Sequence, residues 1–188
     1  RRYSEDVSSD PHVHKVASKP AEVDALVLEL AAAPEFAFDL ETTSLSPLEA
    51  DIVGMSFSWK PGEATWVPAV ERPKKGTFEL FAFELDIREH LEKLRHLLED
   101  PNKKKGGQNV KYDMLVLERY GVKVQGVTFD TLLESYLLDP SARQRNLDEL
   151  ALRYLNYKKI TTESVIGSGK RARTMDNARE REVAAYGS

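Results

Sequence analysis

The sequence predicts a single α/β domain built around a mixed sheet, and three observations point to this class. The 188 residues are enough for one substantial domain with its own core, or at most two small ones. Hydrophobic residues make up 41% and charged residues 31%, as in ordinary soluble globular proteins. Strand-like segments come first along the chain, and helical segments with short strands between them follow, an order that favours a mixed sheet covered by helices.

The strands are predicted from the alternation of apolar and polar side chains and from the turn residues that separate them. The clearest strand is FAFDLE, which follows the helix-breaking Pro34. The turn sequence KPGE lies between two further strand-like segments and predicts a hairpin. The predicted strand segments are 12–18, 36–41, 51–59, 64–70, 103–109 and 126–130.

The helices are predicted from apolar residues at helical spacing and from the residues that can begin or end a helix. Ser18 is a cap candidate for the first helix, with Pro20 in its first turn. Gly121 is the natural end of the third helix, and Asn146, with Glu149 three residues later, begins the fifth as in a capping box. The predicted helical segments are 18–33, 86–100, 110–121, 131–139, 146–156 and 174–188.

The composition excludes several classes of function. The chain has no cysteine, which excludes disulfides and thiolate zinc sites and agrees with a reducing cytoplasm, and no apolar run approaches the ~18 residues of a membrane span. The four histidines do not pair with carboxylates at a ligand spacing. The net charge of −4 does not indicate general nucleic-acid binding, and we expect the basic clusters 72–75, 103–105 and 169–173 to be solvated loops.

The segment FAFDLETTSL carries two carboxylates, Asp39 and Glu41, at the end of a strand. Residues two apart in a strand point to the same face, so these side chains lie together, opposite Phe36, Phe38 and Leu40. Two adjacent like charges repel unless something positive lies between them. The segment is therefore either half of a metal site or a solvated strand end followed by a Thr/Ser turn.

A metal site would need a further carboxylate, because hard divalent cations prefer several oxygen ligands. The best candidate is Asp113 in GQNVKYD, where Gly106 and Gly107 permit a tight backbone approach and Asn109 can cap the following helix. Asp113 then lies one turn into the helix, near the positive end of its dipole. The alternative is a capped helix with a surface Asp in its first turn.

Several stretches, taken in order, resemble the 3′–5′ exonuclease domain of family A bacterial DNA polymerases, a branch of the DEDD (DnaQ-like) superfamily. The stretches are FDLETTSL, GQNVKYD, FDTLLESYLL, KKITTESVIGSGK and VAAYGS. The resemblance covers about residues 12 to 188, after a linker over 1–11. It implies a ribonuclease H-like fold with a mixed sheet of about five strands, and a proofreading function within a cytoplasmic polypeptide that also contains a polymerase domain. No membrane partner is expected.

The resemblance also implies roles for particular residues. Asp39, Glu41 and Asp113 would be metal ligands for two Mg²⁺ ions, with Mn²⁺ or Zn²⁺ as alternatives, and Tyr186 would open the third catalytic motif and help place the attacking water. The substrate would be a single-stranded or frayed DNA 3′ end. The residues expected to contact DNA near the carboxylates are Thr42, Leu45 and Asn109. Apart from the resemblance, the basic charge of the GKRAR loop leaves an alternative to a solvated loop, in which Lys170 and Arg171 contact the phosphate backbone of DNA.

The sequence departs from the family pattern at two positions. The third motif needs an Asp four residues after Tyr186, and we expect that the sequence is cut within this motif. Thr162 stands where related enzymes often carry an aromatic residue near the substrate strand. Two alternatives to a proofreading exonuclease remain: a non-catalytic structural or DNA-binding module of a polymerase, and an RNA exonuclease resembling ribonuclease D.

Overall fold

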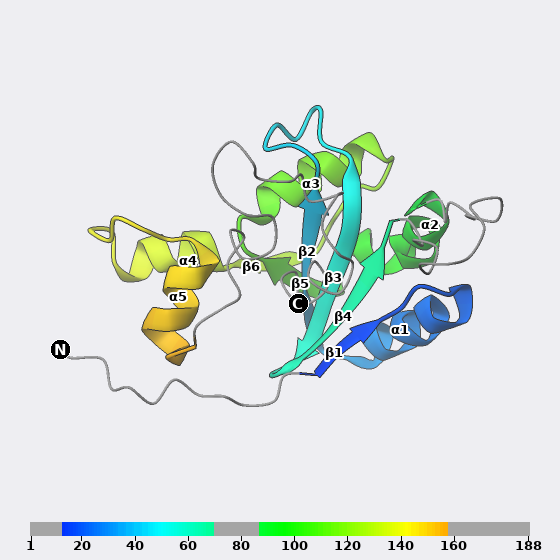
Figure 1. Cartoon of the computed structure of the whole chain (residues 1–188), viewed down its shortest axis with the longest axis horizontal. Coiled ribbons are helices and arrows are strands. Elements are labelled where there is room, and N and C mark those ends of the chain that lie inside the picture. Colours follow the sequence, from blue (N-terminus) through cyan, green and yellow to red (C-terminus); the bar gives the residue numbers. More distant parts are fainter. Residues whose placement is uncertain (1–12, 70–86, 158–188) are drawn as a thin grey trace, which may run out of the picture.

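The computed structural model describes residues 13–69 and 87–157, which form a six-stranded mixed sheet accompanied by helices (Figure 1). The strands lie in the order β1-β4-β3-β2-β5-β6. β3 pairs antiparallel with both β2 and β4, whereas the pairs β1–β4, β2–β5 and β5–β6 are parallel. The bounds are β1 Val13–Val16, β2 Glu35–Thr42, β3 Ile52–Lys60, β4 Glu63–Pro68, β5 Lys104–Gly107 and β6 Val127–Asp130.

Each of the six segments predicted as strands contains a strand, so the sheet has one strand more than the number of about five that the family resemblance implied. The predicted hairpin is also present, as the antiparallel pair β3–β4. Its turn contains Gly62 with a φ of +76°, a left-handed conformation that glycine adopts without steric cost.

The described helices are α1 Pro20–Ala32, α2 Ile87–Leu98, α3 Val110–Arg119, α4 Thr131–Leu138 and α5 Leu147–Leu150, which a turn of π-helix continues over Ala151–Leu155. α1 and α2 pack together at the end of the sheet nearest β1, and α4 and α5 lie at the opposite end, beyond β6 (Figure 1). None of these helices is long and apolar enough to cross a membrane. The helix predicted over 174–188 lies outside the described residues.

The alternation predicted for β2 is confirmed. Phe36, Phe38 and Leu40 are buried in the core, whereas the side chains between them are only half-buried. Burial of each large apolar side chain stabilises the fold by roughly 1.5–3 kcal/mol. The core side of β2 therefore fixes the register of the strand, and the register fixes the face on which Asp39 and Glu41 lie.

The ends of α5 and α3 agree with the sequence at Asn146 and Gly121, whereas the start of α1 does not agree. Asn146 caps α5 by accepting a hydrogen bond from Glu149 N at 2.8 Å, and Gly121 follows α3 with a φ of +81°. The prediction that Ser18 caps α1 is wrong, because Lys19 occupies the cap position. The carboxylate of Glu22 instead accepts hydrogen bonds from Ser18 N and Lys19 N, each at 3.0 Å, and satisfies both donors from inside the helix.

The expectation of a solvated loop at 103–105 is wrong for two of the three lysines. Lys105 is fully buried in β5, and its ammonium donates to Asp100 O and Gln125 O. Burial lowers the pKa of Lys105 to about 8. Lys103 donates to Ala31 O and Ala33 O at the end of α1, so these cations bind backbone carbonyls of the fold. The clusters 72–75 and 169–173 lie outside the described residues.

Candidate active site

The strand β2 lies in the middle of the sheet and presents Asp39 and Glu41 on the face away from Phe38. Asp39 is opposite Ser56 and Glu41 is opposite Gly54 on the antiparallel neighbour β3. The pairing shifts between Glu41 and Thr42, so the strand becomes irregular directly after the second carboxylate. Both carboxylates are half-buried at this end of the strand.

The glycines that precede the second motif are required by close backbone approach, as the sequence predicted. A Cβ on Gly106 would lie 2.1 Å from Phe129 O of β6, and a Cβ on Gly107 would lie 2.4 Å from Phe38 O of β2. No side chain fits at such distances. The two glycines therefore let β5 lie tightly between β2 and β6, which directs the start of α3 toward the carboxylates of β2.

Asp113 lies in the first turn of α3 and is buried, with 2% of its surface exposed. The interpretation of Asp113 as a surface residue is therefore wrong. Burial raises its pKa to about 9, and the negative charges of Asp39 and Glu41 add to this effect, partly offset by a hydrogen bond with the Leu40 backbone. Asp113 thus shares its electrostatic environment with both carboxylates of β2.

The donor chemistry fits a hard divalent cation. Asp39 and Asp113 carry carboxylate oxygens that could serve as ligands, in a region where negative charge is already costly. Mg²⁺ is commonly held by one or two carboxylates, with water and phosphate oxygens as its other ligands. Within residues 13–69 and 87–157, however, no three Asp, Glu or His side chains are arranged to hold one ion together. The predicted trio with Glu41 is not assembled in this part of the chain.

These side chains open onto a cleft of about 690 Å³. One wall comes from the end of β2 and the following loop, a second from the start of α3, and a third from α4 and the segment before α5. The cleft brings together six of the residues predicted from the sequence: Asp39, Glu41, Thr42, Leu45, Asn109 and Asp113. The other predicted site residues, Tyr186, Lys170 and Arg171, and also Thr162, lie outside the described residues.

Leu45 is 97% exposed at the rim of the cleft, although its neighbours hold the loop firmly. The hydroxyl groups of Thr42 and Tyr112 lie 2.6 Å apart, and both side chains hydrogen-bond to Ser44 O. Since Tyr112 belongs to α3, these bonds join the loop to the helix that carries Asp113. Leu45 therefore presents an apolar side chain to solvent from a fixed backbone.

Asn109 lies at the start of α3, but the prediction that its side chain caps the helix is wrong. The residue has a left-handed backbone, with φ 57° and ψ 41°, and its side chain makes no capping hydrogen bond. Asp130 supplies the cap from β6, with its carboxylate accepting from Asn109 N and Val110 N at 3.0 Å each. The Asn109 side chain lines the cleft instead.

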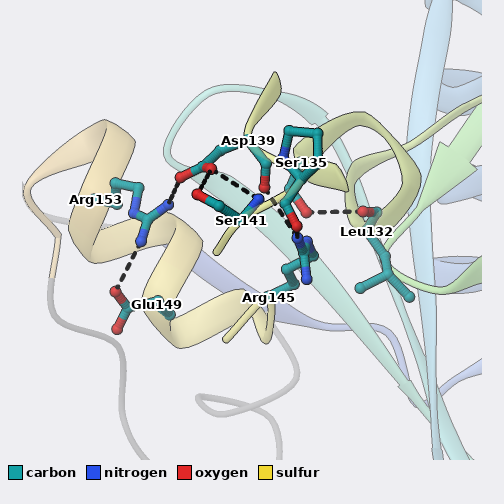
Figure 2. Close-up of polar contacts among 8 residues, drawn as sticks. Leu132, Ser135, Asp139, Ser141, Arg145, Glu149 and Arg153 are labelled. Atoms are coloured by element: carbon teal, nitrogen blue, oxygen red, sulfur yellow. Dashed lines mark hydrogen bonds and ion pairs between the residues drawn. The ribbon is translucent and has the colours of Figure 1, made fainter. Parts of the chain in front are cut away.

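Sequence reasoning missed the cleft residues Tyr112, Gln108 and Arg145. Arg145 donates to Asp139 O at 2.9 Å and Pro140 O at 2.8 Å, and its guanidinium lies 4.8 Å from the centre of the Tyr136 ring. Figure 2 shows Arg145 next to Asp139, which also forms an ion pair with Arg153. These contacts order the loop between α4 and α5, and Gln108 Nε2, which donates to Arg145 O at 2.8 Å, joins this loop to the start of α3. In the sequence, the missed residues could have been found only as neighbours of predicted ones: Tyr112 directly precedes Asp113, and Arg145 directly precedes the cap Asn146.

The mixed sheet, with acidic residues at the end of its central strand and a buried Asp on the adjoining helix, places this chain among α/β proteins of the ribonuclease H-like fold. Two solved structures agree with this fold. RNase D from Trypanosoma brucei has a TM-score of 0.67 and 15% identity, and the match covers 93% of this chain and 60% of that one. Brucella melitensis NrnC with bound Mg²⁺ has a TM-score of 0.59 and 17% identity, and the match covers 93% of this chain and 74% of that one.

The sequence comparison is more specific than the fold. Residues 15–183 match the model of the 3′–5′ exonuclease family, and DNA polymerase I of Pseudomonas aeruginosa is 40% identical over 165 residues, covering 87% of this chain. The chain belongs to the 3′–5′ exonuclease domain family, as the ordered motifs predicted. It spans 18% of the length of the Pseudomonas relative.

Proposed function

We propose that this chain hydrolyses the terminal phosphodiester of a single-stranded or frayed DNA 3′ end and releases a mononucleotide, as the proofreading part of a DNA polymerase I polypeptide. The observation that supports this most directly is the buried Asp113 beside Asp39 and Glu41. A carboxyl whose pKa is raised to about 9 by burial and neighbouring charge is stabilised in its ionised form when a cation binds.

Asp39 and Asp113 would hold the cation, and Glu41 and Tyr186 would orient the attacking water. When bound, one or two divalent ions supply a nucleophile at neutral pH and stabilise the leaving 3′ oxygen. The cleft residues position the strand: Leu45 offers an apolar surface to the terminal base, which suits bases of any sequence. Thr42 and Asn109 face the same cleft and would contact the terminal nucleotide.

A second candidate is a non-catalytic module that binds DNA for the polymerase. The observation in its favour is that the part of the chain described by the structure does not hold three ligands for one ion. The third possibility, an RNA exonuclease, has only the shared fold of RNase D in its favour.

The test is digestion of 5′-labelled single-stranded DNA and RNA with Mg²⁺ or Mn²⁺, and with chelator, by the intact polypeptide that contains this sequence. Asp39→Ala removes a proposed ligand, and Glu29→Ala, an exposed carboxylate on α1, is the matched control. We expect a metal-dependent ladder on DNA from the wild type and Glu29→Ala, and none from Asp39→Ala. A folded wild type that produces no ladder would support the non-catalytic binding module, and a preference for RNA would support the RNA exonuclease.

A further inference from the structure

We infer that Asp130 is a positioning residue for this site, because its one carboxylate holds the first turns of two helices, α3 and α4, that both line the cleft. The inference rests on the proposed exonuclease function. Asp130 ends β6 and is buried, with 9% of its surface exposed. Its backbone is in register with Gly107 of β5, so it lies directly beside the strand that leads into α3.

The carboxylate accepts hydrogen bonds from both helices. On the α3 side, Oδ1 accepts from Asn109 N and Oδ2 from Val110 N, each at 3.0 Å. On the α4 side, Oδ1 accepts from Leu132 N at 2.9 Å and from Leu133 N at 3.4 Å. Hydrogen bonds from backbone N–H groups to an ionised, buried acceptor are among the stronger ones in proteins, and both helix dipoles favour a negative charge here.

The cap on α3 affects the site through Asn109 and Asp113. A helix start normally takes its cap from the side chain of its own N-cap residue. Here Asp130 satisfies the donors from outside the helix, so the Asn109 side chain is not needed as the cap and lines the cleft. Asp113 lies in the same first turn, so the direction in which α3 starts also sets the place of the buried carboxyl relative to β2.

The cap on α4 affects a second wall of the cleft. Leu132, whose N–H is held by Asp130, lines the cleft. The neighbouring Thr131 hydroxyl bonds to Gln108, and Gln108 Nε2 donates to Arg145 O at 2.8 Å. Asp130 thus joins the two helix starts, and Gln108 links the same two walls a second time. Movement of either helix start would change the width of the cleft, and movement of the α3 start would also change the distance between Asp113 and Asp39.

The inference is tested with Asp130→Asn and Asp130→Ala in the intact polypeptide. Asn keeps the shape and one accepting oxygen, whereas Ala removes both acceptors. A loss of stability alone could also lower activity, so the control is a variant that is destabilised without any change at the cleft. Val23→Ala serves this purpose, because it removes buried apolar atoms from α1 far from the cleft. All assays are run well below the melting temperatures. The readouts are kcat and KM on 5′-labelled single-stranded DNA, and Mn²⁺ binding measured by electron paramagnetic resonance.

We expect Asp130→Asn to lower kcat and weaken Mn²⁺ binding by about 10-fold or more, with a larger loss in Asp130→Ala, since residues that orient metal ligands typically contribute 10–100-fold. Val23→Ala should leave both unchanged. Asp130 variants that match Val23→Ala in kcat and Mn²⁺ binding would overturn the inference. A wild type that binds Mn²⁺ but digests no DNA would overturn the proposed function, while the Mn²⁺ comparison would still decide the role of Asp130.

Discussion

Replacement of Asp113 by Asn should change how the stability of the metal-free protein depends on pH. Burial and the nearby Asp39 charge raise the pKa of Asp113 from 3.8 to about 9 in the folded protein. The folded protein therefore keeps this proton to a higher pH than the unfolded chain does. The stabilising effect of the proton is complete below the unfolded pKa and is lost progressively as the pH rises toward 9.

The magnitude follows from the linkage between proton binding and folding. Between the two pKa values, each pH unit changes the free energy of unfolding by about 1.4 kcal/mol. From about pH 5.5 to about pH 7.5, the wild type should thus lose roughly 2–3 kcal/mol relative to Asp113→Asn, which carries no titrating group at this position. The comparison of two pH values cancels any constant effect of the amide itself.

The assay is urea unfolding followed by circular dichroism, with chelator present, for the wild type, Asp113→Asn and the exposed control Glu29→Gln. Glu29→Gln should follow the wild type at both pH values. Added Mn²⁺ should raise the urea midpoint of the wild type more than that of Asp113→Asn, because a bound cation favours the ionised carboxylate. If the wild type and Asp113→Asn change equally with pH, the electrostatic account of the site is wrong.

Three further experiments test the packing of β5, the role of Leu45 in the cleft and the role of the basic GKRAR loop. Gly106→Ala places a Cβ 2.1 Å from a backbone oxygen of β6 and should lower the free energy of unfolding by about 3 kcal/mol or more, as measured by thermal unfolding. Gly121→Ala, where the space is open, should lower it by only about 1–2 kcal/mol, through backbone strain. A larger loss from Gly121→Ala than from Gly106→Ala would contradict this packing. Leu45→Ala should change the free energy of unfolding by less than about 0.5 kcal/mol and raise the KM for single-stranded DNA several-fold. The exposed control Leu28→Ala should change neither stability nor KM. Equal KM values for the wild type and Leu45→Ala would show that Leu45 does not contact the substrate. Alanine at both 170 and 171 should weaken single-strand binding and flatten its salt dependence, as measured by fluorescence anisotropy, and unchanged binding would exclude the basic loop.

Local patterns in the sequence were sufficient to predict the strands and the geometry of the first motif, Asp39 and Glu41. Alternation over 36–41 predicts both the buried face of β2 and the shared face of Asp39 and Glu41, because the side-chain period of a strand is two whatever surrounds it. The Gly106–Gly107 pair predicts close backbone approach for a similarly local reason, since only glycine lacks the Cβ that would clash. The order of the motifs along the chain was enough to predict the family.

Only the tertiary structure decided how these local pieces act on one another. The sequence placed Asn109 as the cap of α3, but a carboxylate from β6, 21 residues further on, takes that role. The surroundings that bury Asp113 come from other elements, so the rise in its pKa has no local signature. Lys105 looks like part of a solvated basic cluster until β5 places it inside the sheet, against carbonyls from two loops. Period and turn chemistry are properties of neighbouring residues, whereas burial, capping from a distance and the charge around a carboxyl depend on which distant segments meet.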